Sequence, residues 1–155
     1  GKSGIRVHGM DDLVCRFARC CAPLPGDDLV GYITRGRGVA IHRKGCVETL
    51  SFDSQRIVTV EWDEAVKTQR HVRIVVYSKD QVGVLAHMSQ SIAGFGANIS
   101  TVECHSDPNG KARSTFDVAI ENSKQLNAIM EALERIEGVL RVDSFRNTQR
   151  TNGKS

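Results

Sequence analysis

Aromatic side chains are scarce in this sequence: they make up 5% of its 155 residues, so a folded core must be built from Val, Ile, Leu and Met. Long apolar runs are missing too, and none approaches the roughly 20 residues that a membrane-spanning helix needs. Residues 1–12 are polar and lack the hydrophobic segment of a secretory signal. We therefore expect a cytoplasmic chain with no membrane partner. Because it begins at Gly1 rather than Met, we expect a fragment of a longer protein.

A disulfide framework is disfavoured, because the five cysteines are an odd number and no secretory signal accompanies them. Reduced cysteines in a cytoplasmic protein are buried, catalytic or metal-bound. Four of the five lie within the first 46 residues: Cys15, Cys20, Cys21 and Cys46. The fifth, Cys104, falls in a predicted strand, where we expect it to belong to the core.

The net charge of +3 is too small to indicate nucleic-acid binding by itself. Its distribution is more informative, because residues 35–44 contain four basic side chains and no acidic one: Arg35, Arg37, Arg43 and Lys44. A basic patch of this kind suits contacts with phosphate groups. A solvated loop is the alternative interpretation.

The sequence divides into two modules at a short polar link near residues 64–69. We expect a first module over residues 1–65, a second over 70–147 and a disordered polar tail over 148–155. In the first module, short strands are predicted at 13–18, 29–34, 39–42 and 57–62, with a short helix at 46–51. These elements predict a small, irregular α+β module. A hydrophobic core in a module of this size stabilises the fold only weakly, so a bound metal ion would add to its stability.

The second module has a regular rhythm. Apolar residues alternate as in strands at 72–77, 98–105, 116–120 and 139–145. Between them, helical spacing relates Val84, Met88 and Ile92, with Leu85 and Phe95 alongside, and a second helix carries Leu126, Ile129, Met130, Leu133 and Ile136. Asn122 and Gln125 have capping-box spacing, and Gly138 suits a left-handed helix end. The order βαββαβ predicts a ferredoxin-like α+β fold, an antiparallel sheet with two helices on one face.

Cysteine and histidine are spaced in the first module as a metal site would require. Cys20 and Cys21 are adjacent, and His42 and Cys46 lie four residues apart. Three thiolates and an imidazole match a tetrahedral zinc site in type. Adjacent side chains diverge in a strand, so both cysteines reach one ion only through a turn, which Pro23 makes credible. The alternative is that the two cysteines are packing thiols and His42 is a surface residue.

Two segments resemble the long RelA/SpoT homologues, the guanosine tetra- and pentaphosphate synthetase/hydrolases of the stringent response. They are residues 12–28, with the doubled cysteine and a Pro-Leu-Pro-Gly-Asp turn, and residues 29–46, with Gly-Arg-Gly followed by His and Cys. This block resembles the family's zinc-finger-like, ribosome-intersubunit module, and the remainder resembles its ACT domain. The resemblance implies metal ligands at Cys20, Cys21, His42 and Cys46. It also implies that the basic loop faces ribosomal RNA and that the catalytic domains, with GTP pyrophosphokinase and hydrolase activity, lie outside this chain.

ACT domains generally dimerise through their sheets and bind an amino acid near the first strand-to-helix turn. The resemblance therefore implies a homodimer and a ligand site, with a branched-chain amino acid as the candidate ligand, at Asp80, Gln81, Val82, Gly83, Val84 and Leu85, with Asn98 and Ile99 beside the turn. Gly83 would let the backbone approach a ligand, and the helix N-terminus would attract a carboxylate. The family pattern Asp-Arg-x-Gly-Leu-Leu is here Asp80-Gln-Val-Gly-Val-Leu85, which puts the ligand's identity in question.

Three hypotheses follow. The first is a non-catalytic regulatory region that senses the ribosome, with its rRNA and tRNA, and a small molecule. The second is an RNA-binding module acting through the basic loop, in which the βαββαβ domain serves only for dimerisation. RNA recognition by the sheet itself is disfavoured, because the third strand offers only Phe116, in phase with the core. The third, a zinc enzyme, is disfavoured because four protein ligands would close the coordination shell.

Overall fold

The structure is a computed structural model that describes residues 4–8, 13–64, 66–67 and 69–146. The chain separates into two compact units, Gly1–Thr68 and Gln69–Ser155. The tail predicted to be disordered lies outside the described residues. Neither of the α-helices in the described part has the length and apolar character needed to cross a membrane.

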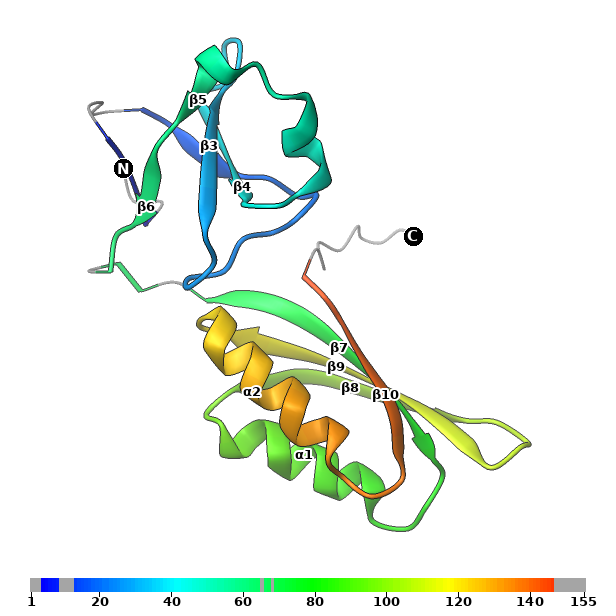
Figure 1. Cartoon of the computed structure of the whole chain (residues 1–155). Coiled ribbons are helices and arrows are strands. Elements are labelled where there is room, and N and C mark those ends of the chain that lie inside the picture. The colour runs from blue at the N-terminus through cyan, green and yellow to red at the C-terminus, as the bar shows by residue number, and fades with distance from the viewer. Residues whose placement is uncertain (1–3, 9–12, 65, 68, 147–155) are drawn as a thin grey trace. The chain divides into compact units, whose positions relative to one another are not determined.

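Unit 1 is built from short strands and two 3-10 turns (Figure 1). One sheet has the order β2-β4-β3-β5, and β1 pairs separately with β6. The β2–β4 pair is parallel, whereas the other pairs are antiparallel. The elements are β1 (Ile5–Val7), β2 (Cys15–Phe17), β3 (Leu29–Ile33), β4 (Val39–Arg43), η1 (Val47–Ser51), η2 (Ser54–Arg56), β5 (Ile57–Val58) and β6 (Val60–Trp62).

The predicted strands of unit 1 are present, with two differences. The helix expected at 46–51 is the 3-10 helix η1, and the strand expected at 57–62 is divided. The division has a cause: β5 pairs with β3 whereas β6 pairs with β1, so the chain changes partner at Thr59. The core is correspondingly small and consists of Ile5, Val39, Ile41 and Val60, with partly buried side chains around it.

Unit 2 is the predicted α+β fold in the order βαββαβ. Its sheet has the strand order β10-β7-β9-β8, antiparallel throughout, and both helices cover one face of it (Figure 1). The elements are β7 (Arg70–Lys79), α1 (Val84–Gly94), β8 (Asn98–Ser106), β9 (Lys111–Ile120), α2 (Ser123–Glu134) and β10 (Val139–Phe145).

The periodicity identified most of the core of unit 2. Buried positions include Val72, Ile74, Val76, Val84, Met88, Ile92, Phe116, Val118, Ile120, Leu126, Ile129 and Leu133. Leu85 and Phe95, expected on the same helical face, are instead 36% and 43% exposed. Cys104 is also exposed, contrary to the expectation of a core position, because β8 is the edge strand.

The predicted N-cap of α2 is confirmed, whereas the predicted C-cap is wrong. Asn122 caps the N-terminus as predicted, since its Oδ1 accepts from the Gln125 amide at 2.7 Å, while Gln125 Oε1 accepts from the Glu121 amide at 2.8 Å. Gly138 is not the C-cap, which is Arg135. Gly138 nevertheless has a left-handed φ of 95°, in the turn that leads into β10.

Candidate metal centre and ligand sites

A tight turn after β2 brings the adjacent cysteines to one side. The Ala22 amide donates to the Ala18 carbonyl at 3.0 Å, which closes a loop around Cys20 and Cys21. Ala22 itself has a φ of 42°, the only left-handed value of a non-glycine residue among those described. Such a conformation costs on the order of 1–2 kcal/mol, so the surrounding structure must stabilise it. The turn that two neighbouring ligands require is therefore present.

A second turn supplies the other two side chains. His42 lies near the end of β4, and the chain reverses so that the Cys46 amide donates to the Arg43 carbonyl at 3.0 Å. Gly45 allows this reversal because its φ is 90°. Cys46 then serves as the N-terminal boundary of η1. The spacing of four residues thus places His42 and Cys46 on the same side of the turn.

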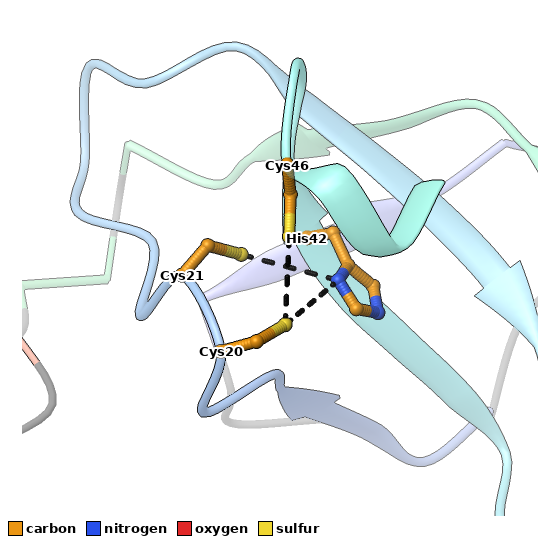
Figure 2. A group of neighbouring side chains, drawn as sticks. All are labelled: Cys20, Cys21, His42 and Cys46. Carbon is orange, nitrogen blue, oxygen red and sulfur yellow. Dashed lines mark hydrogen bonds between the residues drawn. The ribbon is translucent and has the colours of Figure 1, made fainter. Parts of the chain in front are cut away.

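The four side chains converge on one point, as Figure 2 shows. Their ligand atoms all lie within 4.8 Å of one another. Cys20 Sγ is 3.4 Å from His42 Nδ1 and 3.5 Å from Cys46 Sγ, and Cys21 Sγ is 3.9 Å from His42 Nδ1. In a tetrahedral zinc site with Zn–S bonds of about 2.3 Å, neighbouring sulfurs are separated by about 3.8 Å. The cluster has the dimensions of a metal site.

The protonation of the cluster also suits a cation. Partial loss of solvent, with the neighbouring thiols of Cys46 and Cys21, raises the pKa of the Cys20 thiol to about 12. Thiols packed this closely resist ionising together unless a cation balances their charge. Burial lowers the pKa of His42, and the Arg16 guanidinium contributes to this shift. The neutral imidazole is the form that binds metal.

The surroundings favour the metal-site interpretation over packing thiols. Cys20 is exposed, and Cys21 and Cys46 are only partly buried, so none of the three is a core residue. Cys21 Sγ accepts a hydrogen bond from the Arg43 amide at 3.1 Å, the kind of outer contact that orients a thiolate ligand. His42 is held edge-on by Phe52 with ring centroids 5.0 Å apart. Three sulfurs and one nitrogen can hold a metal ion here and leave no ligand position open.

The structure separates the four basic residues that the sequence grouped together. Arg35 and Arg37 lie in the turn between β3 and β4, whereas Arg43 and Lys44 lie at the other end of β4. The strand between them is about 13 Å long at 3.3 Å per residue. Arg43 Nε also lies 3.5 Å from the carboxylate of Asp27. The residues do not form one patch, because a strand, not a loop, connects the two pairs.

The turn predicted to bind an amino acid is open to solvent. Asp80, Gln81 and Val82 are exposed, and Gly83 adopts a left-handed φ of 86° with open space where a Cβ would point. No side chain caps α1, in contrast to α2. The Val84 amide donates to the Gln81 carbonyl at 3.2 Å, so the amides that follow it in the first turn of α1 are the ones open to a carboxylate. Val84 is buried beneath the turn, and Leu85 lies at its surface.

Asn98 and Ile99 do not lie beside this turn, so that prediction is wrong for a single chain. Asn98 is level with Ala119 and His71, whereas the turn follows Ser78, which is level with Ala112 and Ser106. The two positions are at opposite ends of the sheet. The strand after a βα unit begins where the helix ends, which is one helix length from the turn. Asn98 and Ile99 could share a site with Asp80 only if they came from a second copy of the chain.

Two further basic residues, Arg16 and Arg19, were not among the site residues that the sequence predicted. They line a concavity of about 750 Å³ together with Arg37 and His42. The only sign of this role in the sequence was that Arg16 is a polar residue between Cys15 and Phe17, as on the outer face of a strand. That pattern could not reveal the parallel pairing of β2 with β4, which brings Arg16 opposite Ala40.

Comparison with known proteins defines both units. Residues 5–63 match the RelA/SpoT RIS domain, and residues 67–143 match the ACT domain. The chain is therefore a RIS domain followed by an ACT domain, and the two matches together span most of it. These are regulatory domains of RelA/SpoT-type proteins, so the chain is a regulatory region. It belongs to the RelA/SpoT family.

The curated relatives are much longer proteins. The GTP pyrophosphokinase of Myxococcus xanthus is 41% identical over 142 residues, which are 92% of this chain and 19% of that protein. The GTP pyrophosphokinase of Escherichia coli K12 is 32% identical over 139 residues, 86% of this chain and 18% of that protein. Among solved structures, the ACT domain from the GTP pyrophosphokinase of Chlorobium tepidum is 22% identical. It covers 50% of this chain and 99% of that one, with a TM-score of 0.46.

Proposed function

We propose that this chain is the regulatory region of a stringent-response GTP pyrophosphokinase. Unit 1 contacts the ribosome, with its rRNA and tRNA, and unit 2 binds a small molecule and dimerises. Both units would control the synthetase and hydrolase domains of the intact protein, in the cytoplasm, where thiols stay reduced. The support is the RIS–ACT pair itself, in relatives named as GTP pyrophosphokinases. Such control requires that each ligand bind two states of the enzyme with different affinity.

The observation that carries the proposal for unit 1 is the cluster of Cys20, Cys21, His42 and Cys46. We assign it to zinc, because sulfur and imidazole ligands in a closed set of four are typical of structural zinc. Zinc would join the β2–β3 loop to the end of β4 and would supply no catalysis. It would thereby hold the ribosome-facing surface, for which Arg35, Arg37, Arg43 and Lys44 are the candidates that the sequence suggested.

Cosedimentation with purified ribosomes tests this role. The zinc-loaded chain should pellet with ribosomes, and the chain stripped by a chelator should remain in the supernatant until zinc is restored. Equal pelleting of the loaded and stripped chains would remove zinc from the proposal. Failure of the loaded chain to pellet would argue against ribosome contact by this region.

For unit 2 we propose an aliphatic amino acid, with branched-chain amino acids as the first candidates. Its carboxylate would bind the uncapped N-terminus of α1 beside Gly83, and Asp80 would accept from its ammonium group. Val82, Val84 and Leu85 would contact the aliphatic chain, and Gln81 replaces the arginine of the family pattern. Calorimetric titration with valine, isoleucine and leucine, and with serine as the polar control, measures this directly.

The variant Gly83→Asp separates the pocket from the fold. An aspartate carboxylate would occupy the position of the ligand's carboxylate, so we expect amino-acid binding to be abolished. The φ of 86° at Gly83 makes any side chain costly there, by about 1 kcal/mol. Gly96→Asp, in the α1–β8 turn with a φ of 80° and open space around it, is the matched control for that strain, because it lies at the far end of α1 from Asp80. Unchanged affinity in Gly83→Asp would exclude this turn as the site.

A homodimer would complete this site if β8 pairs with its copy. β8 is an edge strand of nine residues, and its side chains are exposed except for Ile99, which is half-buried. An exposed edge of this length is a template for another strand. Antiparallel pairing would turn Asn98 and Ile99 of the second copy toward the end of the sheet that carries Asp80. Sedimentation equilibrium tests the dimer. A dimer without amino-acid binding would favour the alternative, in which unit 2 only dimerises and unit 1 binds RNA.

A further inference from the structure

Two of the clustered thiols lie close enough to be joined to each other. Cys20 Sγ is 3.5 Å from Cys46 Sγ, although the two residues are 26 positions apart in the sequence (Figure 2). The bond length of a disulfide is about 2.05 Å, so the two sulfurs would have to approach each other by about 1.5 Å. The fold therefore brings this pair within a short movement of a covalent bond.

The three thiols of the cluster differ in their access to solvent. Cys20 is exposed, whereas Cys21 and Cys46 are partly buried. Cys21 Sγ also accepts a hydrogen bond from the Arg43 amide at 3.1 Å, which withdraws electron density from that sulfur. Oxidants in solution react first with the sulfur that is most accessible and most nucleophilic. Cys20 is therefore the thiol that an oxidant reaches first.

Chain geometry decides which thiol an oxidised Cys20 can bond. Cys21 is its neighbour in sequence, and consecutive Cα atoms are about 3.8 Å apart. Ordinary disulfides join Cα atoms about 4.4–6.8 Å apart, so a bond between adjacent cysteines closes a strained ring. Cys46 lies on a different segment and is not subject to this restriction. The partner that the geometry favours is Cys46.

The segment around Cys46 can make the movement that a bond requires. Cys46 directly precedes η1, which contains no buried residue. Val47 and Leu50 of η1 are 72% and 84% exposed. Gly45, on the other side, has open space around it. A shift of Cys46 toward Cys20 therefore leaves the core of unit 1 in place.

We propose that Cys20 and Cys46 form a reversible disulfide when hydrogen peroxide reaches the cluster. The Cys20 sulfur attacks the peroxide, the O–O bond breaks, and a sulfenic acid and one water are formed. The Cys46 sulfur then attacks the sulfenic sulfur, and a second water leaves as the S–S bond forms. The two sulfurs lose two electrons and the peroxide gains them. Two thiols supply the two protons that the waters need, and solvent supplies them where the sulfurs are thiolates.

The disulfide would remove half of the ligand set. A disulfide sulfur has no negative charge, so only Cys21 and His42 would remain to bind a metal ion, whereas structural zinc has four ligands. We therefore expect metal to be lost as the bond forms. A dithiol reductant would restore both thiols by exchange. The inference goes beyond the proposed function, because the pairing of the thiols depends on neither the ribosome nor an amino acid.

Peptide mapping of the zinc-loaded wild-type chain after treatment with hydrogen peroxide tests the pairing. Unreacted thiols are alkylated, and trypsin then cleaves the chain without reductant. Cleavage places Cys20 and Cys21 in the peptide 20–35 and Cys46 in the peptide 45–56. We expect these two peptides to be cross-linked, with Cys21 alkylated, and to separate after treatment with dithiothreitol. A chromogenic chelator should detect zinc release with the same time course.

Two adjacent cysteines provide a matched pair of variants. Cys20→Ser and Cys21→Ser make the same substitution, and each removes one ligand. The cross-link should form in Cys21→Ser and be lost in Cys20→Ser. Cys104→Ser removes the exposed thiol of unit 2 and should leave the cross-link unchanged. If either single variant loosens unit 1, the wild-type map still decides the pairing, because it requires no substitution.

Three results would overturn the pairing. The first is a linear peptide 20–35 in which Cys20 and Cys21 are bonded to each other. The second is a cross-link that leaves Cys20 alkylated and uses Cys21. The third is oxidation of Cys104 while the thiols of the cluster all remain alkylated.

Zinc is scored separately from the pairing. A cross-link formed without zinc release would overturn the expected loss of metal. A chain that binds no zinc at all would overturn the zinc assignment of the proposed function, and the peptide map would still decide whether Cys20 and Cys46 pair.

Discussion

Unit 1 and unit 2 obtain their structures by different means. Strands β7 and β9 of unit 2 have ten residues each, and two helices seal a core around Phe116 and Ile74. Strands of unit 1 have two to five residues, and its core cluster contains four buried apolar side chains. The remaining order in unit 1 comes from glycine turns and from the cysteine–histidine cluster. The comparison teaches that a small core needs local chemistry to specify its shape.

The sharpest test of this difference is removal of the metal ligands. In Cys20→Ser, Cys21→Ser we expect the metal to be lost and unit 1 to unfold, while unit 2 unfolds as before. The effect should be the largest considered, because structural zinc contributes on the order of 10 kcal/mol to small domains. Metal analysis and thermal unfolding measure the two consequences.

The matched control is Cys104→Ser, which alters an exposed thiol of unit 2 and should change neither quantity. A double cysteine variant that keeps its unfolding transition, with no change in bound metal, would favour packing thiols over ligands.

The reverse test targets the core of unit 2. Phe116→Ala empties a fully buried position in the central part of the sheet, and we expect a loss of about 3–5 kcal/mol in the free energy of unfolding of unit 2. Metal content and the unfolding of unit 1 should not change. Urea unfolding followed by circular dichroism, with Trp62 fluorescence reporting on unit 1, distinguishes the units. A parallel loss in unit 1 would show that the units fold together.

A pair of glycines measures how far unit 1 depends on its turns. Gly36 and Gly38 have φ values of 75° and 73°, so alanine is strained at either position. Only at Gly38 would a Cβ also meet backbone, at 2.1 Å from the Val14 carbonyl oxygen. We expect Gly36→Ala to cost about 1 kcal/mol and Gly38→Ala about 2–3 kcal/mol.

Chemical unfolding of both alanine variants measures these costs. The difference between them isolates the close approach of β2 to the β3–β4 turn, where the Val39 amide donates to Val14 at 2.8 Å. Equal costs would mean that the chain relaxes around Gly38 and that this approach contributes little.

The smallest effect concerns the surface of the β1–β6 pair. A hydrogen bond from His8 lowers the pKa of Glu61 below its ordinary value of 4.5. The carboxylate therefore stabilises unit 1 above that ordinary value, and the contribution is lost as the pH falls through the lowered pKa. Wild-type chain and Glu61→Gln should differ slightly at neutral pH and converge in acid. A difference that grows as the pH falls would contradict the shift.

Much of unit 2 could be predicted because its signals are long and repeated. Alternation over whole strands and helical spacing through α1 and α2 identified both the element order and the buried residues. The burial predictions were wrong for residues at the edges of unit 2. Leu85, Phe95 and Cys104 match the apolar pattern of their elements, yet they lie where no other element covers them.

In unit 1, single residues carried more information than periodicity did. The doubled cysteine, Pro23 and the His42–Cys46 spacing predicted a cluster that the structure brings within 4.8 Å. The basic residues between positions 35 and 44 were predicted as one patch, and β4 separates them instead. Proximity in sequence indicates proximity in space only where the chain turns back, and here it extends.

The sequence by itself determined the two-part organisation, the βαββαβ order and the residue types of the metal centre, because each depends on local spacing. Tertiary structure alone decided which strands pair, and hence everything that depends on pairing. The parallel partnership of β2 with β4 places Arg16 across from Ala40, so that both line one concavity. The register of β8 on β9 sends Asn98 to the far end of the sheet from Asp80. Both are contacts between distant segments, which the free energy of the whole fold selects and no local pattern encodes.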